Sequence, residues 1–326
     1  MKKVLLASTA LVLSAGVAAA DVTVGGDGRM GIVNNFDPDN TLGFTSRLRI
    51  AFTAAGETDS GLAFGGSIRA DNSGGFNFDD IGIDGLDASD VVPGGGVNGV
   101  AGSVFISGDF GRLSMGDVAG APEAAVGDVS GVGLTGLGDL NEMTYLSNRN
   151  ATARSAMRYD YTFGDFGFHV SADNPVAYPG SAALRTENET YGVALTYAGD
   201  LFSAGLGYET RDAERILTGG TVGPTGDHII GGVTVDFAGA TIKGIYGMAD
   251  IDGADEFDQY GISVDYGFDA TTLTAFYTGG DEELKAEAFG LGVSYDLGGG
   301  ASVKAGYVQN ETIDEDAFDF GVSMSF

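Results

Sequence analysis

The sequence predicts an all-β fold, a 16-stranded antiparallel transmembrane β-barrel whose long third external loop folds inward. Three observations lead to this prediction. Apolar and polar residues alternate with a period of two along most of the chain, and short and long connections follow one another between the alternating stretches. The N-terminus reads as an export signal, and beyond it no run approaches the roughly 18 apolar residues that a membrane helix needs. Together these features are typical of outer-membrane barrels.

The N-terminal segment 1–20 has the parts of a secretory signal peptide. Two lysines form a positive start, an apolar run follows over 4–17, and three alanines that end at Ala20 make an A-x-A cleavage site. We expect cleavage between Ala20 and Asp21. The mature domain would then be a single barrel over 21–326.

The composition limits the possible classes of function. The chain holds 46 acidic and 16 basic residues, a net charge of −30, with 56 glycines and no cysteine. Removing the signal peptide takes away 2 of the 16 basic residues, which leaves 14 and a net charge of −32. Such a chain has too few cations to neutralise phosphates, which excludes nucleic acid as a partner. Charged residues at 19% and aromatic residues at 10% also distinguish it from disordered acidic proteins.

Sixteen stretches alternate in this way, with apolar side chains on one face and mostly Gly, Ser, Thr, Asp or Arg on the other. They lie near residues 22–34, 41–55, 61–71, 103–110, 112–117, 157–163, 168–172, 191–197, 202–208, 229–237, 242–248, 260–266, 273–277, 289–295, 303–307 and 318–326. A soluble β-sandwich is the alternative, but its water-facing side would carry many Lys and Glu. Because lipid tolerates no free sheet edge, we expect the first and last strands to pair.

The alternation stops over 117–152, which begins DVAGAPEAAVGDVSGVGLTGLGDLNEMTYLSNR. A structureless connection of this length is uncommon and is usually functional. It is rich in glycine and small residues, and four carboxylates are spaced along it: Glu123, Asp128, Asp139 and Glu142. We expect this connection to fold into the barrel and narrow a water-filled pore, with the carboxylates forming the acidic side of the constriction.

Six arginines fall on the polar faces of the first, second, third and sixth predicted strands: Arg29, Arg47, Arg49, Arg69, Arg154 and Arg158. An arginine on the lipid face would cost about 2–4 kcal/mol at mid-membrane, so we expect all six to point into the lumen. If 117–152 packs beside the first three strands, they form a basic wall that faces its carboxylates. Fixed charges at a constriction decide which ions pass, and the acidic chain favours a modest preference for cations. Alternatively, the arginines simply pair with nearby carboxylates for stability.

Several stretches resemble the general porins of Rhodobacter-type α-proteobacteria. They are GGDGRMGIVNNF, SRLRIAFTAAGETDSGLAFGGSIRA, GSVFISGDFGRLSMGDVAGAPEAAVGD, YGFDATTLTAFYTGG and FGLGVSYDLGGGASVKAGY. The resemblance covers the whole mature chain, although the connection 72–102 looks long for its position. It implies a homotrimer in the outer membrane of a Gram-negative bacterium, in contact with lipopolysaccharide. It also implies passive diffusion of small hydrophilic solutes and ions through a 16-stranded barrel, without a cofactor and without enzymatic activity.

Other motifs carry weaker signals. The pattern G-x-G-x-x-G at 26–31 lies in a predicted strand and leads into no predicted helix, so it is not a dinucleotide site. Two histidines, His169 and His228, and no cysteine disfavour a zinc site or a cysteine nucleophile. We interpret His169 and the nearby Ser171 as ordinary strand neighbours rather than members of a catalytic triad.

Two other functions stay open at this point. One is an outer-membrane channel that is specific for a sugar or an anion. The other, from a different class, is a secreted acidic calcium-binding β-protein or adhesin, although the nonapeptide of such proteins does not recur at a fixed period. Acidic loops such as 79–90 could hold single Ca²⁺ ions, because flexible, oxygen-rich loops suit that ion.

Overall fold

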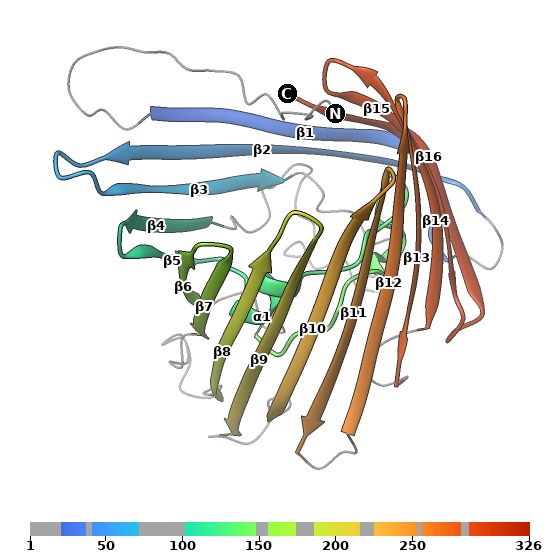
Figure 1. Cartoon of the computed structure of the whole chain (residues 1–326). Helices are drawn as coiled ribbons and strands as arrows, with labels where there is room; N and C mark the ends of the chain where they lie inside the picture. Colours follow the sequence, from blue (N-terminus) through green and yellow to red (C-terminus); the bar gives the residue numbers. More distant parts are fainter. Residues whose placement is uncertain are drawn as a thin grey trace, which may run out of the picture.

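The computed structural model describes residues 21–36, 41–71, 102–147, 156–173, 186–215, 225–252, 256–281 and 287–326. Within these ranges sixteen strands form one closed barrel (Figure 1). They are β1 (Asp21–Asn34), β2 (Gly43–Glu57), β3 (Ala63–Asp71), β4 (Gly102–Gly108), β5 (Gly111–Gly116), β6 (Ala156–Phe163), β7 (Phe166–Asp173), β8 (Thr186–Ala198), β9 (Phe202–Arg215), β10 (Gly226–Phe237), β11 (Ala240–Ile251), β12 (Glu256–Phe268), β13 (Thr271–Gly280), β14 (Ala288–Gly298), β15 (Ala301–Asn310) and β16 (Glu315–Ser325). A helix, α1 (Ala121–Val126), and a 3₁₀ turn, η2 (Leu137–Asp139), lie between β5 and β6. No helix in the described ranges is long and apolar enough to cross a membrane.

The barrel closes between the two ends of the chain. All neighbouring strands are antiparallel, and β1 pairs with β16 as well as with β2. At this closing seam, Gly31 lies opposite Gly321 and Ile32 lies opposite Phe320. Closure leaves no unpaired edge, which is the condition for β-structure in lipid. The predicted barrel and the predicted pairing of its terminal strands are confirmed.

The sixteen predicted stretches coincide with the sixteen strands, but several strands extend beyond them. β8 begins at Thr186 and β12 at Glu256, each several residues before its alternation begins. The physical reason is that the backbone ladder continues into 186–190 of β8 and 256–259 of β12, where the sequence has no apolar alternation to mark it. The predicted short turns are present, for example at Ala238 and Gly239, both with positive φ as tight hairpin turns require.

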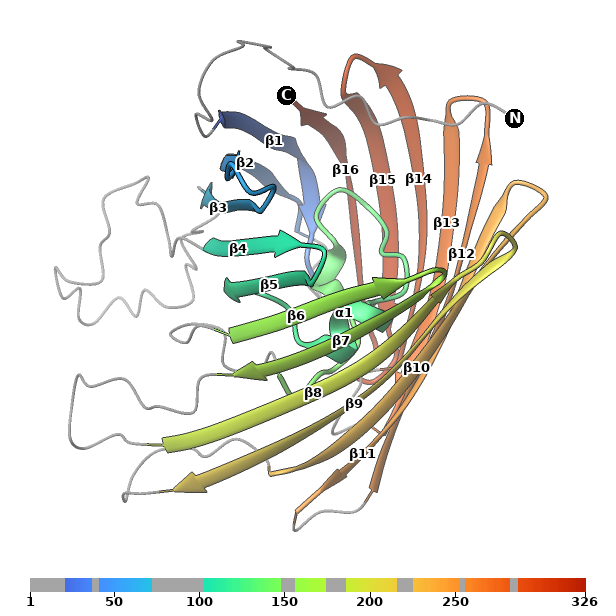
Figure 2. The ribbon, with the colours of Figure 1, turned by 60° about the vertical axis from the view of Figure 1, so that its left-hand side comes forward.

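The wall of the barrel differs in height around its circumference (Figure 2). β4 and β5 have 7 and 6 residues, whereas β8 to β12 have between 12 and 14. Along the strands, large apolar side chains such as Val24, Leu206 and Ile262 point outward and are exposed. Most positions between them carry glycine or polar residues and face the lumen, which is the alternation of a barrel with lipid outside and water inside.

The buried apolar core of this protein lies inside the barrel. Much of it comes from residues 117–147, hereafter the luminal segment, which runs along the inner wall (Figures 1 and 2). The segment contributes Val126, Val129, Val132, Leu137, Met143 and Tyr145, and the strands contribute Ile230, Ile245, Phe276, Ala288, Val308 and Ala317. Burying one large apolar side chain contributes about 1.5–3 kcal/mol, so apolar packing alone favours this position of the segment.

Candidate functional site: the luminal segment and its walls

The luminal segment enters the barrel through α1. Pro122 stands in the first turn, where its missing N–H costs no helical hydrogen bond. The Ala121 amide donates to the Ser171 hydroxyl of β7 at 2.8 Å, which takes the place of a side-chain cap. The wall is shaped for this approach, because a Cβ added to Gly207 of β9 would lie only 2.6 Å from the Pro122 side chain. The helix therefore packs directly against the backbone of the barrel wall.

Inward-facing glycines continue this close approach along the whole seat of the segment. On each of them an added Cβ would lie within 3.0 Å of a segment atom. These glycines are Gly192, Gly205, Gly207, Gly232, Gly261, Gly292, Gly306, Gly321 and Gly31. Glycine weakens a strand, and one usual reason for its presence is the close approach of another backbone. We call this row, which runs from β8 through β16 to β1, the glycine track.

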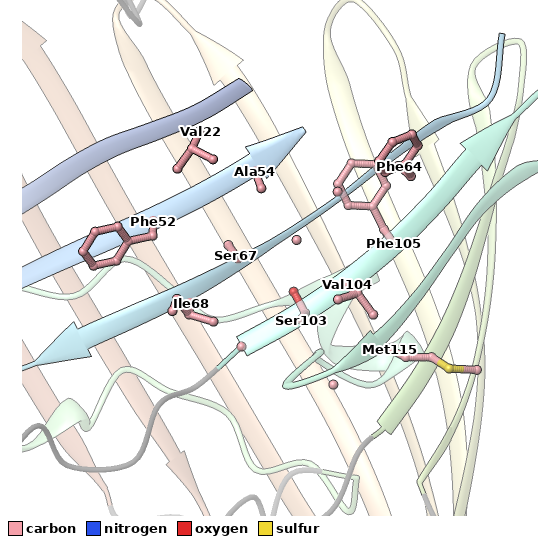
Figure 3. Close-up of a pocket in the computed structure, with 14 residues that line it drawn as sticks. Val22, Phe52, Ala54, Phe64, Ser67, Ile68, Ser103, Val104, Phe105 and Met115 are labelled. Carbon is pink, nitrogen blue, oxygen red and sulfur yellow. The ribbon is translucent and has the colours of Figure 1, made fainter. Parts of the chain in front are cut away.

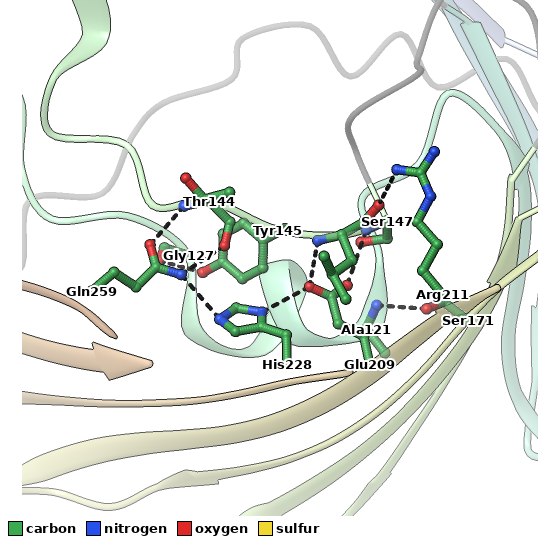
Figure 4. A network of polar contacts seen from close by, with 11 residues as sticks. Ala121, Gly127, Thr144, Tyr145, Ser147, Ser171, Glu209, Arg211, His228 and Gln259 are labelled. Carbon is green, nitrogen blue, oxygen red and sulfur yellow. Dashed lines mark hydrogen bonds and ion pairs between the residues drawn. The ribbon is translucent and has the colours of Figure 1, made fainter. Parts of the chain in front are cut away.

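Buried polar side chains of β9 and β12 hold the end of the segment (Figure 4). Glu209 accepts the amides of Leu146 at 2.6 Å and Ser147 at 3.1 Å. Gln259 accepts the Thr144 amide and donates to the Thr144 carbonyl, both at 2.8 Å. Glu209 and Gln259 are 0% exposed, so the backbone groups here depend on these two side chains rather than on water.

His228 of β10 lies between these two side chains (Figure 4). Its Nδ1 is 2.9 Å from Glu209 Oε1, and its Nε2 is 3.0 Å from Gln259 Nε2. The carboxylate requires a donor and the amide nitrogen requires an acceptor, so the ring is the neutral tautomer with the proton on Nδ1. Tyr145 packs edge-on against the ring and donates to Gly127 O at 2.7 Å. Burial raises the pKa of Tyr145 and keeps this donor protonated.

Further strands hold the middle of the segment. Lys243 of β11 donates to Val126 O at 2.6 Å, and Thr278 of β13 donates to Leu140 O at 2.9 Å. Thr278 is fully buried, whereas Lys243 is only partly so. One carbonyl lies at the C-terminal end of α1 and the other just after η2, and buried carbonyls need a hydrogen-bond partner. The segment is thus fastened at intervals along its course.

The tip of the segment meets the closing seam. Asp319 of β16, which is 2% exposed, accepts the amides of Leu134 and Thr135. Arg29 of β1 donates to the carbonyls of the same two residues, at 3.3 and 3.1 Å. One acidic and one basic side chain, from the first and the last strand, therefore hold the same turn of the segment.

Arg29, Arg47 and Arg49 form a basic cluster on the inner face of β1 and β2, where the strand register places them. Arg29 lies opposite Arg47, and Asp27 lies opposite Arg49. The Asp27 carboxylate is 2.9 Å from Arg49 Nη2 and 3.9 Å from Arg47 Nη2. The side chains of Arg47 and Arg49 are 22% and 26% exposed, so the cluster carries net positive charge that water can reach.

The other predicted arginines lie elsewhere. Arg158 of β6 donates through Nε to both oxygens of Asp160 and through Nη1 to Ala119 O at 3.0 Å, where the segment begins. Arg69 is exposed on β3, and Arg154 lies outside the described residues. The predicted basic wall thus divides into a cluster on β1 and β2, an exposed arginine on β3 and an arginine that holds the entry of the segment.

His169 belongs to the same region as Arg158. Its Nδ1 is 2.7 Å from Asp160 Oδ1, and its Nε2 is 3.1 Å from Thr196 Oγ1. Ser171 instead accepts the amide that begins α1. The two residues therefore do not form the contact between nucleophile and base that covalent catalysis requires. The glycine pattern at 26–31 lies within β1, as the sequence indicated.

The four predicted carboxylates of the segment occupy different environments. Asp139 and Glu142 are exposed. Asp128 accepts the amide of Met143 at 2.7 Å, so it shapes the segment itself. Glu123 is half-buried on α1, and burial followed by the charge of Asp128 raises its pKa to about 7. The exposed carboxylates are the ones that passing ions can approach.

A seat beside the first three strands, the condition set above for charges that face each other, is wrong. The segment lies against β7 to β16, and it also reaches β1, where Arg29 donates to it and Leu134 lies against Gly31. The reason is the distribution of small residues and buried acceptors. The glycine track and the residues Glu209, Gln259 and Asp319 belong almost entirely to β8 through β16. The wall of β2 and β3 carries arginines instead.

Sequence reasoning missed the anchors of the segment, which are Glu209, His228, Gln259 and Asp319. A signal was available for two of them. Glu209 and Asp319 stand in strand interiors, in GYETR and AFDFG, where an unpaired carboxylate would be costly to bury. A buried carboxylate needs hydrogen-bond donors. In a barrel of this kind, the backbone amides of a loop that folds inward can provide them.

Two expectations concern parts of the chain that lie outside the described residues: the signal peptide 1–20 and the acidic loop 79–90, with its suggested Ca²⁺ ions. Within the described ranges, no group of three or more His, Asp or Glu side chains is arranged to hold a metal ion.

Comparisons with known proteins agree with this architecture. The family model described as Gram-negative porin matches residues 7–315. A porin of Rhodobacter capsulatus is 33% identical over 326 residues, and one of Fuscovulum blasticum is 26% identical over 313. A porin structure refined at 1.8 Å superposes with a TM-score of 0.74 at 29% identity, and a mutant of Rh. blastica porin with 0.65 at 20%. Each comparison covers 94% of this chain and 100% of the other protein.

Proposed function

The chain belongs to the Gram-negative porin family, and from this premise we propose how its lumen selects solutes. Members of this family are channels, and this chain is a general diffusion porin of the outer membrane. Our proposal is that the luminal segment narrows the water-filled channel to an eyelet. Small hydrophilic solutes and ions pass through it, with a modest preference for cations.

The observation that carries the proposal is the placement of exposed charge on two different parts of the lumen. Asp139 and Glu142 are exposed on the luminal segment, and Arg47 and Arg49 are partly exposed on β2. The segment itself is held on the wall of β7 to β16, and β9 in that wall lies halfway round the barrel from β1. Opposed charges across a narrow, water-filled gap produce a field transverse to the axis.

This field has consequences for what passes. Dipolar solutes can orient along it, whereas apolar solutes would have to displace the water that it orders. The direction of ion selectivity follows from the total charge. The mature chain carries a net charge of −32, by the count given above, so the channel and its mouth attract cations more than anions. The exposed arginines keep this preference modest.

The experiment measures reversal potentials in a salt gradient across planar bilayers. Replacing Arg47 and Arg49 with Gln removes the exposed positive charges, and the cation-to-anion permeability ratio should rise by about twofold per charge. Asp139→Asn with Glu142→Gln should lower it by a similar factor. Asn suits position 139 because Asp139 has φ +53°, a conformation that Asn tolerates.

The matched control is Arg112→Gln, which removes a positive charge from β5. That guanidinium lies 3.7 Å from the centroid of the Phe105 ring, outside the basic cluster. A change of selectivity per removed charge equal to that of the cluster variant would show that the charges act only through the total charge of the chain. If both double variants keep the selectivity of the parent, the eyelet assignment is refuted.

We also propose a homotrimer in which the wall formed by β1 to β5 contacts the neighbouring subunit. The outer face of β1 to β5 carries an apolar groove of about 910 Å³ (Figure 3). Its lining includes Val22, Phe52, Ile68, Val104 and Met115. Small outward residues at the start of β1 permit close approach in a membrane. Native mass measurement in mild detergent should give the trimer, and Val104→Arg should shift it toward monomer; a parent that is monomeric at all concentrations contradicts this proposal.

Export to the outer membrane requires a signal, and we propose that segment 1–20 provides it. The supporting observation is its sequence of a positive start, an apolar run and an A-x-A site. N-terminal sequencing of the protein from outer membranes should begin at Asp21. Mature protein that begins with Met1 would contradict the proposal.

A further inference from the structure

The tip of the luminal segment occupies a notch in the closing seam. Gly31 of β1 and Gly321 of β16 are register partners across this seam. A Cβ added to either glycine would lie 2.6 Å from Leu134 Cδ2. Leu134 is 7% exposed, so its side chain fills the space that two missing side chains leave. One residue of the segment therefore packs on both closing strands at once.

Polar contacts at the same place reach the same two strands. The Asp319 carboxylate of β16 accepts the Leu134 amide at 2.9 and 2.8 Å and the Thr135 amide at 2.6 Å. It also accepts the Thr135 hydroxyl at 2.8 Å. Arg29 of β1 donates to both carbonyls of this turn. Asp319 and Arg29 thus clamp the turn, and Gly31 and Gly321 form the notch for Leu134. In both cases one residue comes from β1 and the other from β16, so the two strands together make the docking site for residues 134–135.

The seam is where a barrel most needs such a contact. It joins the first and last strands, so its closure has the largest loop entropy to overcome. Eight residue pairs form its register, and the tip of the segment adds contacts to both strands. The facing pair of Gly31 and Gly321 adds no cross-strand side-chain contact of its own. Leu134 supplies the missing contact from inside the barrel.

We propose that Leu134, Asp319 and Arg29 are positioning residues that fasten the closing seam and the tip of the luminal segment to each other. Neither closing strand alone provides the notch or the clamp, so the tip docks only when the barrel is closed. The docked tip in turn keeps β1 and β16 together. The part of this inference that concerns the pore rests on the proposed narrowing role of the segment.

The first experiment measures amide hydrogen exchange of the folded protein in lipid vesicles. Leu134→Ala empties the notch without altering either strand, and it should speed exchange in β1 and β16 by about tenfold. Exchange in β10 and β11 should stay at the parental rate. The matched control is Val132→Ala, because Val132 is equally buried but packs on Gly292 of β14, away from the seam. It should leave exchange at the seam unchanged.

Rescue and a second variant test the role further. Leu134→Met fills the same notch with a flexible apolar chain and should restore slow exchange at the seam. Asp319→Asn places an amide donor against the backbone donors of the turn and should speed exchange as Leu134→Ala does. The inference is overturned if Leu134→Ala leaves exchange at the seam unchanged, or if Val132→Ala speeds it equally.

Single-channel recording separates this inference from the proposed function. A tip released from the seam should move, so Leu134→Ala should add fluctuations between current levels that Val132→Ala and Leu134→Met lack. Steady current in Leu134→Ala would overturn the positioning role in the pore. If charge variants of the eyelet leave selectivity unchanged while Leu134→Ala still opens the seam, only the proposed function fails.

Discussion

The inner wall of β7 to β16 and the inner wall of β1 and β2 share one strand pattern but carry different polar residues. On the first wall several polar side chains are buried and hydrogen-bonded to the luminal segment or to each other, as with Glu209, Gln259 and Thr278, each 0% exposed. On the second wall Arg49 and its partner Asp27 remain 26% and 42% exposed. Alternation of polar and apolar residues therefore does not distinguish a seat for a loop from a charged surface in water.

The two walls therefore affect different properties of the protein, its stability and its ion selectivity. A buried acceptor that satisfies backbone donors acts on stability, because the donors have no other partner. A water-exposed charge contributes little to stability, because solvent screens it, but it acts on every ion that passes. Substitutions on the first wall should therefore change the free energy of unfolding, and those on the second wall should change selectivity.

The strongest test of this contrast is Glu209→Ala. It leaves the amides of Leu146 and Ser147 without their acceptor in a site that is closed to water. Each buried unpaired donor costs about 1–3 kcal/mol, so the free energy of unfolding should fall by roughly 3 kcal/mol or more. Urea unfolding from lipid vesicles, followed by circular dichroism, measures it. Asp212→Ala on the same strand is the control, since Asp212 is exposed and should change little. Equal losses in both variants would contradict the contrast.

A smaller effect is expected for Tyr145→Phe, in the luminal segment that this wall holds. The Tyr145 hydroxyl donates to Gly127 O at 2.7 Å within the segment, and the residue is 5% exposed. Losing this bond while keeping the ring should lower the free energy of unfolding by about 1 kcal/mol. Tyr161→Phe provides the comparison, because Tyr161 is 39% exposed on the outer face. If the two variants unfold at the same urea concentration, the bond to Gly127 contributes nothing to stability.

The sequence predicted the barrel well because a membrane imposes a simple rule. Alternation and turn chemistry in one strand depend on that strand and its neighbours, and the sixteen strands and the closure between Asp21 and Phe326 follow from them. The seat of the segment depends on contacts such as Leu134 with Asp319, which are 185 residues apart. No local sequence pattern reveals such a distant pair. From sequence alone a glycine such as Gly306 only weakens its strand, and the structure shows that it makes room for the segment.

A third prediction concerns pH. Burial, and then the charge of Asp128, raises the pKa of Glu123 to about 7 from 4.5. An acid with a raised pKa is charged only above it, so the eyelet gains negative charge as pH rises from about 6 to about 8. The cation preference should therefore increase by about twofold over this window. Reversal potentials at the two pH values measure it, and Glu123→Gln should remove most of the change.

The control for this pH effect is Glu142→Gln, which should keep the pH dependence while lowering the preference at every pH. Stability should move in the opposite direction. Because the folded state holds the Glu123 proton more tightly than the unfolded state, its contribution to stability is lost as pH rises from 4.5 to about 7. A pH dependence of selectivity that persists unchanged in Glu123→Gln would assign the effect to another group.

The smallest effect on stability is expected for Asp27→Asn in the basic cluster. Asp27 contacts both Arg47 and Arg49, so the substitution breaks two ion pairs, yet its side chain is 42% exposed. Exposed pairs contribute about 0–1 kcal/mol, and the free energy of unfolding should stay within that range of the parent. Selectivity should respond more clearly, because Arg47 and Arg49 lose the carboxylate that pairs with them and the cluster repels cations more strongly. The cation preference should fall by about twofold in the salt-gradient measurement. A loss of stability as large as that of Glu209→Ala would mean that the two walls do not differ in the way their exposure indicates.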